Sequence, residues 1–331
     1  MLLLIKVDKR KEAKVMGNKK VVILGGGTGS SRVLMSLKDL PLDITAVITV
    51  SDDGSSTGVL RKEFTVPGIG DIRKVLSNLS TLPDEVKKVM ESRLSTYSDL
   101  NNHAIGNLAL IAYLKETGSL QTSIERLSQL LQVKHTVLPL SEDFVTLMGK
   151  TVDGEIVEWE ENITESGKKY EKIFYKEEPH VLPRVIEKIL EADLVIISIG
   201  SLYTSILPHL ICKDIVKAIN DTNAKVMYVC NAMTQPGETD GFGVSDHVDT
   251  LEKYIGKDTI DVVLASNTVI EEEMLRKYET KEQKDQVRID KENMVGKKYE
   301  LIEADLLTTE EGKITHNSMK ISSIIFSYLM R

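Results

Sequence analysis

An apolar run, residues 21–24, leads directly into the segment Gly25-Gly26-Gly27-Thr28-Gly29-Ser30-Ser31. The run predicts a buried strand, and the glycines predict a tight turn that opens a helix. A helix N-terminus directs backbone N–H groups and the positive end of its dipole at one point, which favours a bound anion. Glycine leaves the space that a phosphate needs there, because it has no Cβ. A nucleotide diphosphate is therefore the first ligand that this turn predicts.

A second expected strand, residues 44–50, ends in an acidic and glycine-rich segment, residues 51–58. In a doubly wound sheet, acidic groups at the end of the second strand lie beside the phosphate pocket, where they meet a ribose or a metal ion. We therefore take Asp52 and Asp53 as candidate ligands of Mg²⁺ or of a ribose and, with Asp240, as candidate catalytic residues. A role of Asp52 and Asp53 as turn formers or helix caps stays open.

Strand and helix patterns alternate through the first 130 residues and again after residue 180. Short apolar strands separated by helices indicate a parallel sheet covered on both faces. The predicted fold is therefore α/β, with a Rossmann-like, doubly wound and mostly parallel sheet. Beyond those above, helices are expected near 33–40, 71–79, 83–94, 107–114, 120–131, 181–190 and 271–286, strands at 194–199, 226–230 and 260–265, and a strand and helix within 313–331.

The region from about 133 to 180 has a different pattern, with short strands at 137–140, 144–147 and 151–157 and a hairpin signal at Asp153-Gly154. We interpret it as a small antiparallel β subdomain within a single domain, residues 19–331. Residues 1–18 precede the first core strand, and the sequence does not decide between an extra strand, a loose arm and a misplaced start.

Composition excludes several classes of function. The net charge of −8 disfavours unspecific nucleic-acid binding. The N-terminal apolar stretch has five residues, too few for a signal sequence or a membrane span, so we expect a cytoplasmic protein without membrane insertion. Cys212 and Cys230 have no metal-binding spacing, and we interpret them as buried thiols in a reducing compartment.

Polar clusters follow five of the expected strands, and the carboxyl ends of parallel strands share one edge of the sheet. Arg73 is a candidate for neutralising a phosphate, with a pair to Asp71 as the alternative. A plain N-capped helix start is the alternative for residues 200–205. The candidate residues for binding nucleotide or phosphate are Gly25, Gly26, Gly27, Thr28, Gly29, Ser30, Arg73, Asn107, Gly200, Ser201, Thr204, Ser205, Asn231, Thr234 and Gln235.

The sequence has no recognisable nucleophile with its base, and no zinc-ligand spacing. Ser30 replaces the third glycine of the dinucleotide fingerprint, so we expect NAD to bind opportunistically at most. No Lys-Ser/Thr pair follows the turn, which excludes a P-loop. The remaining polar residues suit binding of a phosphorylated ligand, or phosphoryl transfer aided by a metal, better than acyl chemistry.

Six motifs occur in the order that a known family shows. From about Lys19 onward the chain resembles the YvcK/CofD-like family, and most closely its bacterial branch, the gluconeogenesis factors. The motifs are Gly25-Gly26-Gly27-Thr28-Gly29, residues 51–58, Gly70-Asp71-Ile72-Arg73, His103-Ala104-Ile105-Gly106-Asn107, residues 200–205, and residues 231–241, whose Met-Thr-Gln-Pro-Gly-Glu-Thr-Asp-Gly stretch is specific to that branch.

The resemblance implies a nucleotide-diphosphate site over the glycine turn of a Rossmann-like sheet. Relatives in the family transfer 2-phospho-L-lactate from a guanosine-diphosphate-linked donor to a deazaflavin precursor, with Mg²⁺. The bacterial branch is tied to cell shape and cell-wall synthesis on gluconeogenic carbon sources, and to UDP-sugars such as UDP-N-acetylglucosamine. A homodimer and a regulatory protein partner in cell-wall synthesis are further expectations from the resemblance.

The chain departs from the family pattern at three places. Ile69 precedes Gly70-Asp71 where the family has proline, and Ser198-Ile199 stand before Gly200 where it has Gly-Pro. Residues 315–318 read Thr-His-Asn-Ser where the family often has Arg-His-Asp-Thr. The missing arginine removes a strong phosphate contact. Ser318 replaces a threonine that is phosphorylated in some members.

Three functions follow as hypotheses. The first is a nucleotide-sugar-binding regulator without a committed reaction. The second is a Mg²⁺-dependent transferase of the 2-phospho-L-lactate type, and the third is an NAD(P)-dependent oxidoreductase. We favour the first, because it needs only a diphosphate site and explains why no nucleophile is visible.

Overall fold

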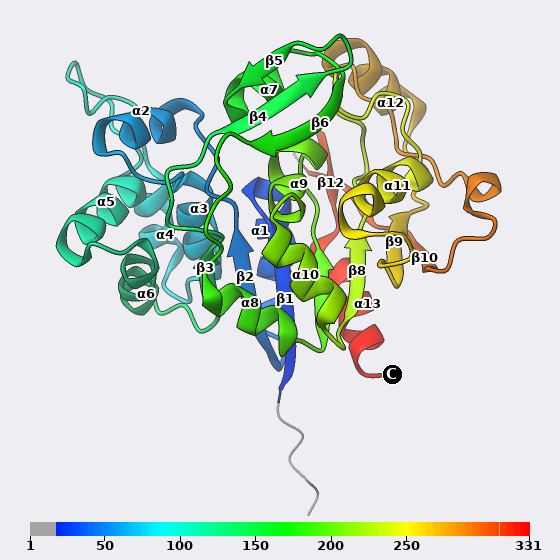
Figure 1. The fold of residues 1–331 in the computed structure, drawn as a ribbon, viewed down its shortest axis with the longest axis horizontal. Coiled ribbons are helices and arrows are strands. Elements are labelled where there is room, and N and C mark those ends of the chain that lie inside the picture. Colours follow the sequence, from blue (N-terminus) through cyan, green and yellow to red (C-terminus); the bar gives the residue numbers. More distant parts are fainter. Residues whose placement is uncertain (1–17, 311) are drawn as a thin grey trace, which may run out of the picture.

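The computed structural model describes residues 18–310 and 312–331, and its centre is a seven-stranded sheet (Figure 1). The strand order is β10-β9-β8-β7-β1-β2-β3, and every neighbouring pair is parallel. The chain thus winds outward from β1 in one direction and then from β7 in the other, which confirms the doubly wound prediction. The strands are β1 (Lys19–Gly25), β2 (Leu42–Ile48), β3 (Thr136–Pro139), β7 (Leu194–Ile197), β8 (Lys225–Val229), β9 (Val262–Ser266) and β10 (Glu300–Ala304).

Helices cover both faces of the sheet, because alternate side chains of its strands point to opposite faces. Val21 and Ile23 of β1 belong to one buried cluster, and Val22 and Leu24 to the other. The first face carries α1 (Gly27–Leu37), α3 (Gly70–Leu79), α5 (Ile105–Thr117), α6 (Leu120–Leu130) and α13 (Ser318–Leu329). The second carries α8 (Pro183–Leu190), α9 (Leu207–Leu210), α10 (Lys213–Asp221) and α11 (Val244–Ile255).

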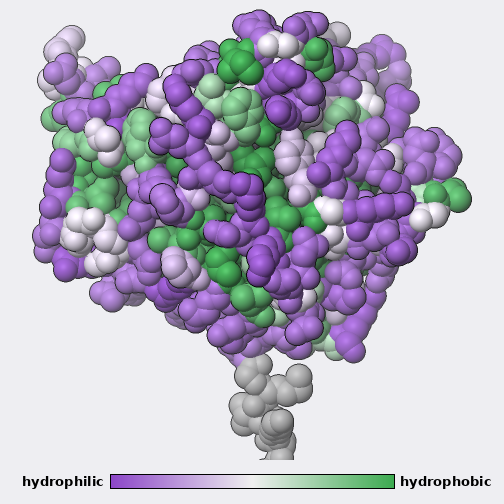
Figure 2. Space-filling view, viewed as in Figure 1, coloured by the Kyte–Doolittle hydropathy of each residue, from purple (hydrophilic) through white to green (hydrophobic). Residues whose placement is uncertain are grey.

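The surface seen over α8, α10 and α11 is mostly hydrophilic, with hydrophobic side chains in patches (Figure 2). None of the helices within residues 18–310 and 312–331 has the length and apolarity that a membrane span needs. Cys212 and Cys230 are both buried and unbonded to each other, as predicted. Of the expected lead over residues 1–18, all but Asn18 lie outside the described residues.

A small antiparallel sheet, order β5-β4-β6, lies over the carboxyl ends of the main sheet (Figure 1). It comprises β4 (Leu147–Thr151), β5 (Ile156–Glu158) and β6 (Tyr170–Tyr175), with α7 (Glu160–Glu165) between the last two. The prediction for 137–140 was wrong in one respect, since these residues form β3 and pair with β2 of the main sheet. A four-residue apolar run does not indicate which sheet it joins. Residues 144–146 are not a strand.

The sequence patterns did not predict several elements of the fold. Helix α2 (Ser55–Phe64), which begins inside the acidic and glycine-rich segment, was not predicted, and neither were α10, α11 and β10. The helix expected over 271–286 ends early, as α12 (Glu272–Lys277) followed by a π-helical turn, Tyr278–Glu282. The helix does not continue beyond Gln283, which has φ +53°, and the Thr234 N–H donates to the Asp285 carbonyl at 2.8 Å. The other elements are α4 (Asp84–Glu91), a π-helical turn (Leu202–Ile206), a 3-10 turn (Lys291–Met294), β11 (Leu307–Glu310) and β12 (Lys313–His316).

Candidate functional site

The glycine turn lies between β1 and β7, where the two halves of the sheet diverge. Helix α1 starts there with Gly26 as its N-cap, so no side chain caps its first turn. Gly27 has φ +68°, which favours glycine, and a Cβ on Gly26 would lie 2.9 Å from both the Asp71 Oδ2 and the Thr49 Oγ1 atoms. The turn therefore combines uncapped N–H groups with open space at Gly27, where an added Cβ would have no heavy atom nearer than 3.8 Å.

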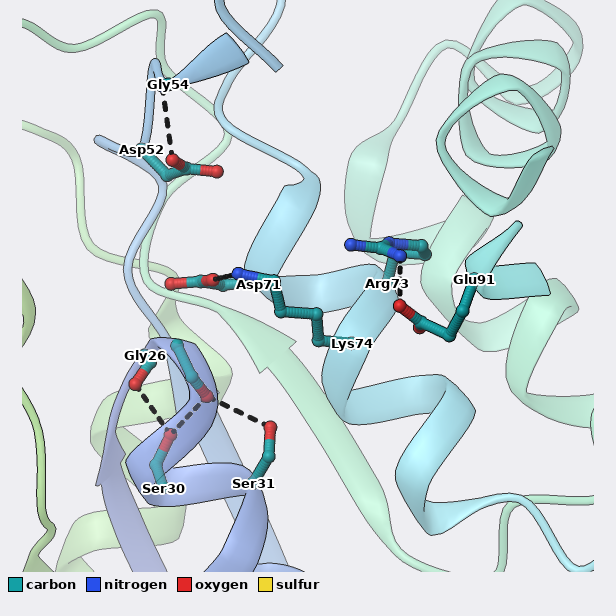
Figure 3. A network of polar contacts seen from close by, with 10 residues as sticks. Gly26, Ser30, Ser31, Asp52, Gly54, Asp71, Arg73, Lys74 and Glu91 are labelled. Carbon is teal, nitrogen blue, oxygen red and sulfur yellow. Dashed lines mark hydrogen bonds and ion pairs between the residues drawn. The ribbon is translucent and has the colours of Figure 1, made fainter. Parts of the chain in front are cut away.

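Two serines stabilise this turn from behind (Figure 3). The hydroxyl of Ser30 donates to the carbonyl of Gly26 at 2.9 Å, and that of Ser31 donates to the carbonyl of Gly27 at 3.0 Å. Both serines are buried, and Gly29 packs against the carbonyl of Ile199. These residues shape the turn, whereas Gly27 and Thr28 face a cavity.

That cavity, here called the acidic cavity, has a volume of about 180 Å³. Residues from five separate parts of the fold reach it: the glycine turn, the end of β2, helix α3, the start of α7 and the Gly200–Ser205 turn. Its charged members are three carboxylates and one ammonium group. The cavity is lined by Gly27, Thr28, Thr49, Asp52, Asp71, Lys74, Glu160, Thr204 and Ser205.

The negative charge of the acidic cavity is only partly balanced. The Lys74 Nζ lies 3.0 Å from the Asp71 Oδ1, and these two groups form an ion pair (Figure 3). Burial, and then the charge of Asp71, raises the pKa of Asp52 to about 6. Burial, and then the charge of Asp52, raises the pKa of Glu160 to about 7. Burial and like charge make the ionised forms of these carboxylates unfavourable. Such carboxylates indicate a site where a ligand or a cation supplies the hydrogen bonds or positive charge that the protein does not.

A second cavity of about 440 Å³, here called the wide cavity, lies on the other side of the Gly200–Ser205 turn. The Asn231 amide holds this turn, donating to the Gly200 carbonyl at 2.7 Å and accepting from its N–H at 3.2 Å. Gly200 lines the wide cavity, and Thr204 and Ser205 line the acidic one. The wide cavity is lined by Ile199, Gly200, Asn231, Ala232, Met233, Thr234, Gln235, Tyr278, Glu282, Lys284, Lys313, Ile314, Thr315 and His316.

Unpaired polar atoms characterise the wide cavity. The Thr315 Oγ1 and the His316 Nε2 are buried and have no hydrogen-bond partner within the described part of the chain. Burial lowers the pKa of His316 to about 4, so its imidazole is neutral near pH 7. A neutral imidazole and a hydroxyl suit the polar edge of a neutral group such as a nucleobase. Lys313 adds positive charge at the same cavity, and the Lys284 Nζ lies 2.9 Å from the carboxylate of Glu282, which also lines it.

Nine of the residues predicted for the site line one of the two cavities. Gly27, Thr28, Asp52, Thr204 and Ser205 line the acidic cavity, and Gly200, Asn231, Thr234 and Gln235 line the wide cavity.

Other predicted residues support the loops. The Ser201 hydroxyl donates to the buried carboxylate of Glu238 at 2.7 Å and accepts from the Thr204 N–H at 3.0 Å. Gly25 packs against Ser30. Asp240 is exposed and accepts from the Gly237 N–H at 2.9 Å.

Three further predicted residues, Asp53, Arg73 and Asn107, also line neither cavity. The Asp53 Oδ1 accepts from the Glu161 N–H at 2.9 Å, at the start of α7. Arg73 forms an ion pair with Glu91, which is neither of the two partners weighed above (Figure 3). Asn107 is buried, and its Nδ2 donates to the Ser56 hydroxyl at 3.4 Å. These contacts hold the surrounding elements together.

The structure adds site residues that the sequence did not indicate. Asp71 and Lys74 lie one turn apart on α3, within and just after a motif that was noted, but nothing in their pattern indicated a cavity. Thr315 and His316 belong to a segment noted only for its missing arginine. Glu160 had no signal in the sequence, because the small sheet brings it to the cavity.

The site supplies oxygen donors from carboxylates and hydroxyls, the ligand type that Mg²⁺ prefers. Within residues 18–310 and 312–331, no three or more His, Cys, Asp or Glu side chains are grouped so as to hold a metal ion. Magnesium commonly binds through one or two carboxylates together with phosphate oxygens and water. Asp52, beside the glycine turn, fits that mode only when a phosphate ligand contributes oxygens.

Comparison with known proteins agrees with the resemblance found in the sequence. The family model described as 2-phospho-L-lactate transferase CofD matches residues 21–307. The Gluconeogenesis factor of Bacillus subtilis is 40% identical over 316 residues, covering 95% of this chain and 99% of the relative. The Gluconeogenesis factor of Halalkalibacterium halodurans is 37% identical and covers 94% and 96%. A crystal structure of a Bacillus halodurans protein superposes with a TM-score of 0.90 at 36% identity, covering 93% of this chain and 99% of that one.

Proposed function

The chain belongs to the family of 2-phospho-L-lactate transferase CofD, and from that premise we propose that it binds a nucleoside-diphosphate sugar across its two cavities. UDP-N-acetylglucosamine is the first choice of ligand. In this proposal the protein is a binding factor that supports cell shape and the supply of cell-wall precursors during gluconeogenic growth. Its relatives named gluconeogenesis factors support this direction.

The observation that carries the proposal is the uncapped start of α1 at the point where β1 and β7 diverge. The glycine turn offers backbone N–H groups to a diphosphate, and the dipole of an eleven-residue helix adds to their attraction. The acidic cavity borders the turn through Gly27 and Thr28. The wide cavity lies across the Gly200–Ser205 turn. A diphosphate at the glycine turn would therefore join a group in each cavity.

The wide cavity suits the nucleoside. The unpaired Thr315 hydroxyl and the neutral His316 imidazole offer a donor and an acceptor to a base. Lys313 supplies positive charge in place of the missing arginine, whereas Lys284 is paired with Glu282 at 2.9 Å. Lysine contacts a phosphate as a point charge, without the two-pronged geometry of arginine. The wide cavity therefore retains attraction for phosphate without that residue.

Magnesium belongs to the proposal as a companion of the phosphates. Asp52 would hold it together with phosphate oxygens, and Asp71, close to the glycine turn, would attract it. The ion would screen the diphosphate from the carboxylates of the acidic cavity when bound. The protein's own part is to orient the ligand and keep the unpaired carboxylates in place.

A transferase of the 2-phospho-L-lactate type is the second candidate, favoured by the matching family model. The same Asp52 would act there, with an acceptor hydroxyl entering beside the ligand. The two functions differ in their ligand and in turnover.

Isothermal titration against UDP-N-acetylglucosamine, GDP and NAD, each with and without Mg²⁺, tests the proposal. We expect micromolar binding that is selective for the UDP-sugar, with the ligand recovered intact by mass spectrometry. Magnesium-dependent selectivity for GDP would favour the transferase instead. Selectivity for NAD would contradict both.

A further inference from the structure

We infer that Glu160, which the small sheet carries to the acidic cavity, restricts that cavity to uncharged, hydroxyl-bearing groups on the diphosphate. Sugar nucleotides with a neutral sugar then bind, and those with an acidic sugar are excluded. The inference rests on the proposed function and adds to it a residue that determines specificity.

The position of Glu160 depends on an unusual backbone conformation just before it. Trp159 has φ +78° and ψ 142°, a region that bulky side chains rarely adopt. Its N–H donates to the Leu147 carbonyl at 2.9 Å. Its ring packs edge-on against Phe144, with centroids 6.2 Å apart, and the Lys62 Nζ lies 5.3 Å from its centroid. The contacts of Trp159 hold its backbone in an unfavourable conformation. Strain of this kind occurs at functional sites, and here it fixes the position of the next residue, Glu160.

Contacts from the main sheet fix the start of α7 in the same place. The Asp53 carboxylate accepts from the Glu161 N–H at 2.9 Å, and the Glu161 Oε1 accepts from the Ser55 N–H at 3.2 Å. The Arg61 guanidinium lies 5.7 Å from the Trp159 ring and donates to the backbone carbonyl of Ser51 at 2.9 Å. Glu160 is therefore positioned by the small sheet and by the end of β2 together.

The chemistry of the acidic cavity determines what it accepts. Lys74 is paired with Asp71, so Asp52 and Glu160 have no ion-pair partner among the described residues. Ionised carboxylates only accept hydrogen bonds, and a sugar hydroxyl can donate to them. The hydroxyls of Thr28, Thr204 and neighbouring side chains both donate and accept. A carboxylate on the ligand would instead meet like charges at close range.

A matched pair of ligands isolates this effect. UDP-glucose and UDP-glucuronic acid differ only at carbon 6, which belongs to a hydroxymethyl group in the first and to a carboxylate in the second. With Mg²⁺ at pH 8, we expect the protein to prefer UDP-glucose at least tenfold. In Glu160→Gln this preference should shrink to about threefold or less, mainly because UDP-glucuronic acid binds more tightly. Trp159 is the single tryptophan of the chain, so its fluorescence reports ligand arrival beside Glu160.

Glu165→Gln is the control, because Glu165 is exposed on the same helix and does not line the cavity. It should keep the full preference. If Glu160→Gln does not fold, Glu160→Asp retains the charge on a shorter chain and should weaken the exclusion by a smaller factor. Equal affinity for both ligands in the unmodified protein, or an unchanged preference in Glu160→Gln, would overturn the inference.

UDP alone separates this inference from the proposed function. Binding of UDP with no effect of Glu160 on the sugar preference contradicts the inference and leaves the proposed function standing. Absence of UDP binding contradicts the proposed function and, with it, the inference.

Discussion

At the amino ends of the strands, Asp193 lies between the Lys19 ammonium at 2.9 Å and the Lys20 N–H at 2.8 Å. At the carboxyl ends, Asp52 lies beside a second carboxylate, Asp71. Burial alone would raise the pKa of Asp193, but the hydrogen bonds from Lys19 and Lys20 outweigh it and lower that pKa. For Asp52, burial and the charge of Asp71 act in the same direction, and both raise its pKa.

Asp261 repeats the pattern of the amino ends, with the Lys225 Nζ at 2.6 Å and the Val226 N–H at 2.9 Å. One sheet thus contains carboxylates that are satisfied within the protein and carboxylates that are not. The satisfied ones stabilise the fold. The others favour binding, because a ligand or cation that neutralises them gains electrostatic free energy that no contact within the protein provides. The predictions below test this division.

The largest effect is expected at the glycine turn. Gly27→Val should lower nucleotide affinity by about a hundredfold or more, because valine is strained at φ +68° and its methyl groups would face the phosphate position. Titration calorimetry measures it. Gly118→Val is the matched control, since Gly118 has φ +70° at the exposed end of α5 and no heavy atom within 4 Å of an added Cβ. Equal loss of binding in both variants would remove the turn from the site.

The next effect separates the two aspartates. Asp52→Asn should remove most of the gain in nucleotide affinity that Mg²⁺ provides, about tenfold, because an amide is a weak magnesium ligand. Asp193→Asn should leave binding unchanged and destabilise the fold by about 1 kcal/mol, since its lysine partner is partly solvated. Calorimetry with and without Mg²⁺, together with urea unfolding, measures both. A Mg²⁺ response that persists in Asp52→Asn would exclude Asp52 as the ligand.

Stability should depend on pH in opposite directions at the two ends. The raised pKa values of Asp52 and Glu160 mean that the folded state holds protons which the unfolded state has released between about pH 4 and 7. Stability therefore falls as pH rises through this window, by about 1.4 kcal/mol for each unit by which a pKa is raised. The charged groups around the pair are Asp53, Asp71, Arg61 and Lys74.

The lowered pKa of Asp193 has the opposite sign, so its contribution is present above its unfolded pKa and is lost as pH falls below about 4. Urea unfolding of the ligand-free protein at pH 2, 3, 4, 5, 6, 7 and 8 measures both trends. The double variant Asp52→Asn, Glu160→Gln should flatten the fall between about pH 4 and 7. An identical slope in the double variant would show that other groups cause it.

The smallest effect on binding is expected at Arg73. Because Arg73 pairs with Glu91 and lines neither cavity, Arg73→Met should change nucleotide affinity by less than threefold. It should lower the free energy of unfolding by about 1–3 kcal/mol, since it removes the hydrogen bond of a buried guanidinium, although its partner Glu91 is partly exposed. Loss of affinity comparable to that of Gly27→Val would place Arg73 at the phosphate after all.

Much of this protein follows from the sequence alone. The apolar run 21–24 and the glycines after it determined the first strand, the turn and the start of α1, because strand burial and positive φ are local requirements. Polar segments at strand ends predicted nine residues that line the two cavities. Parallel strands bring those segments to one edge whatever the details of the loops.

Only the tertiary structure decided how the polar residues are used. Asp52 and Asp53 are neighbours in sequence, yet one lines the acidic cavity and the other holds the start of α7. Glu160 reaches the cavity because the small sheet folds over the main one. Local patterns specify conformation and burial, whereas the pairing of a charge depends on which distant segment packs against it, and that is settled only when the whole core forms.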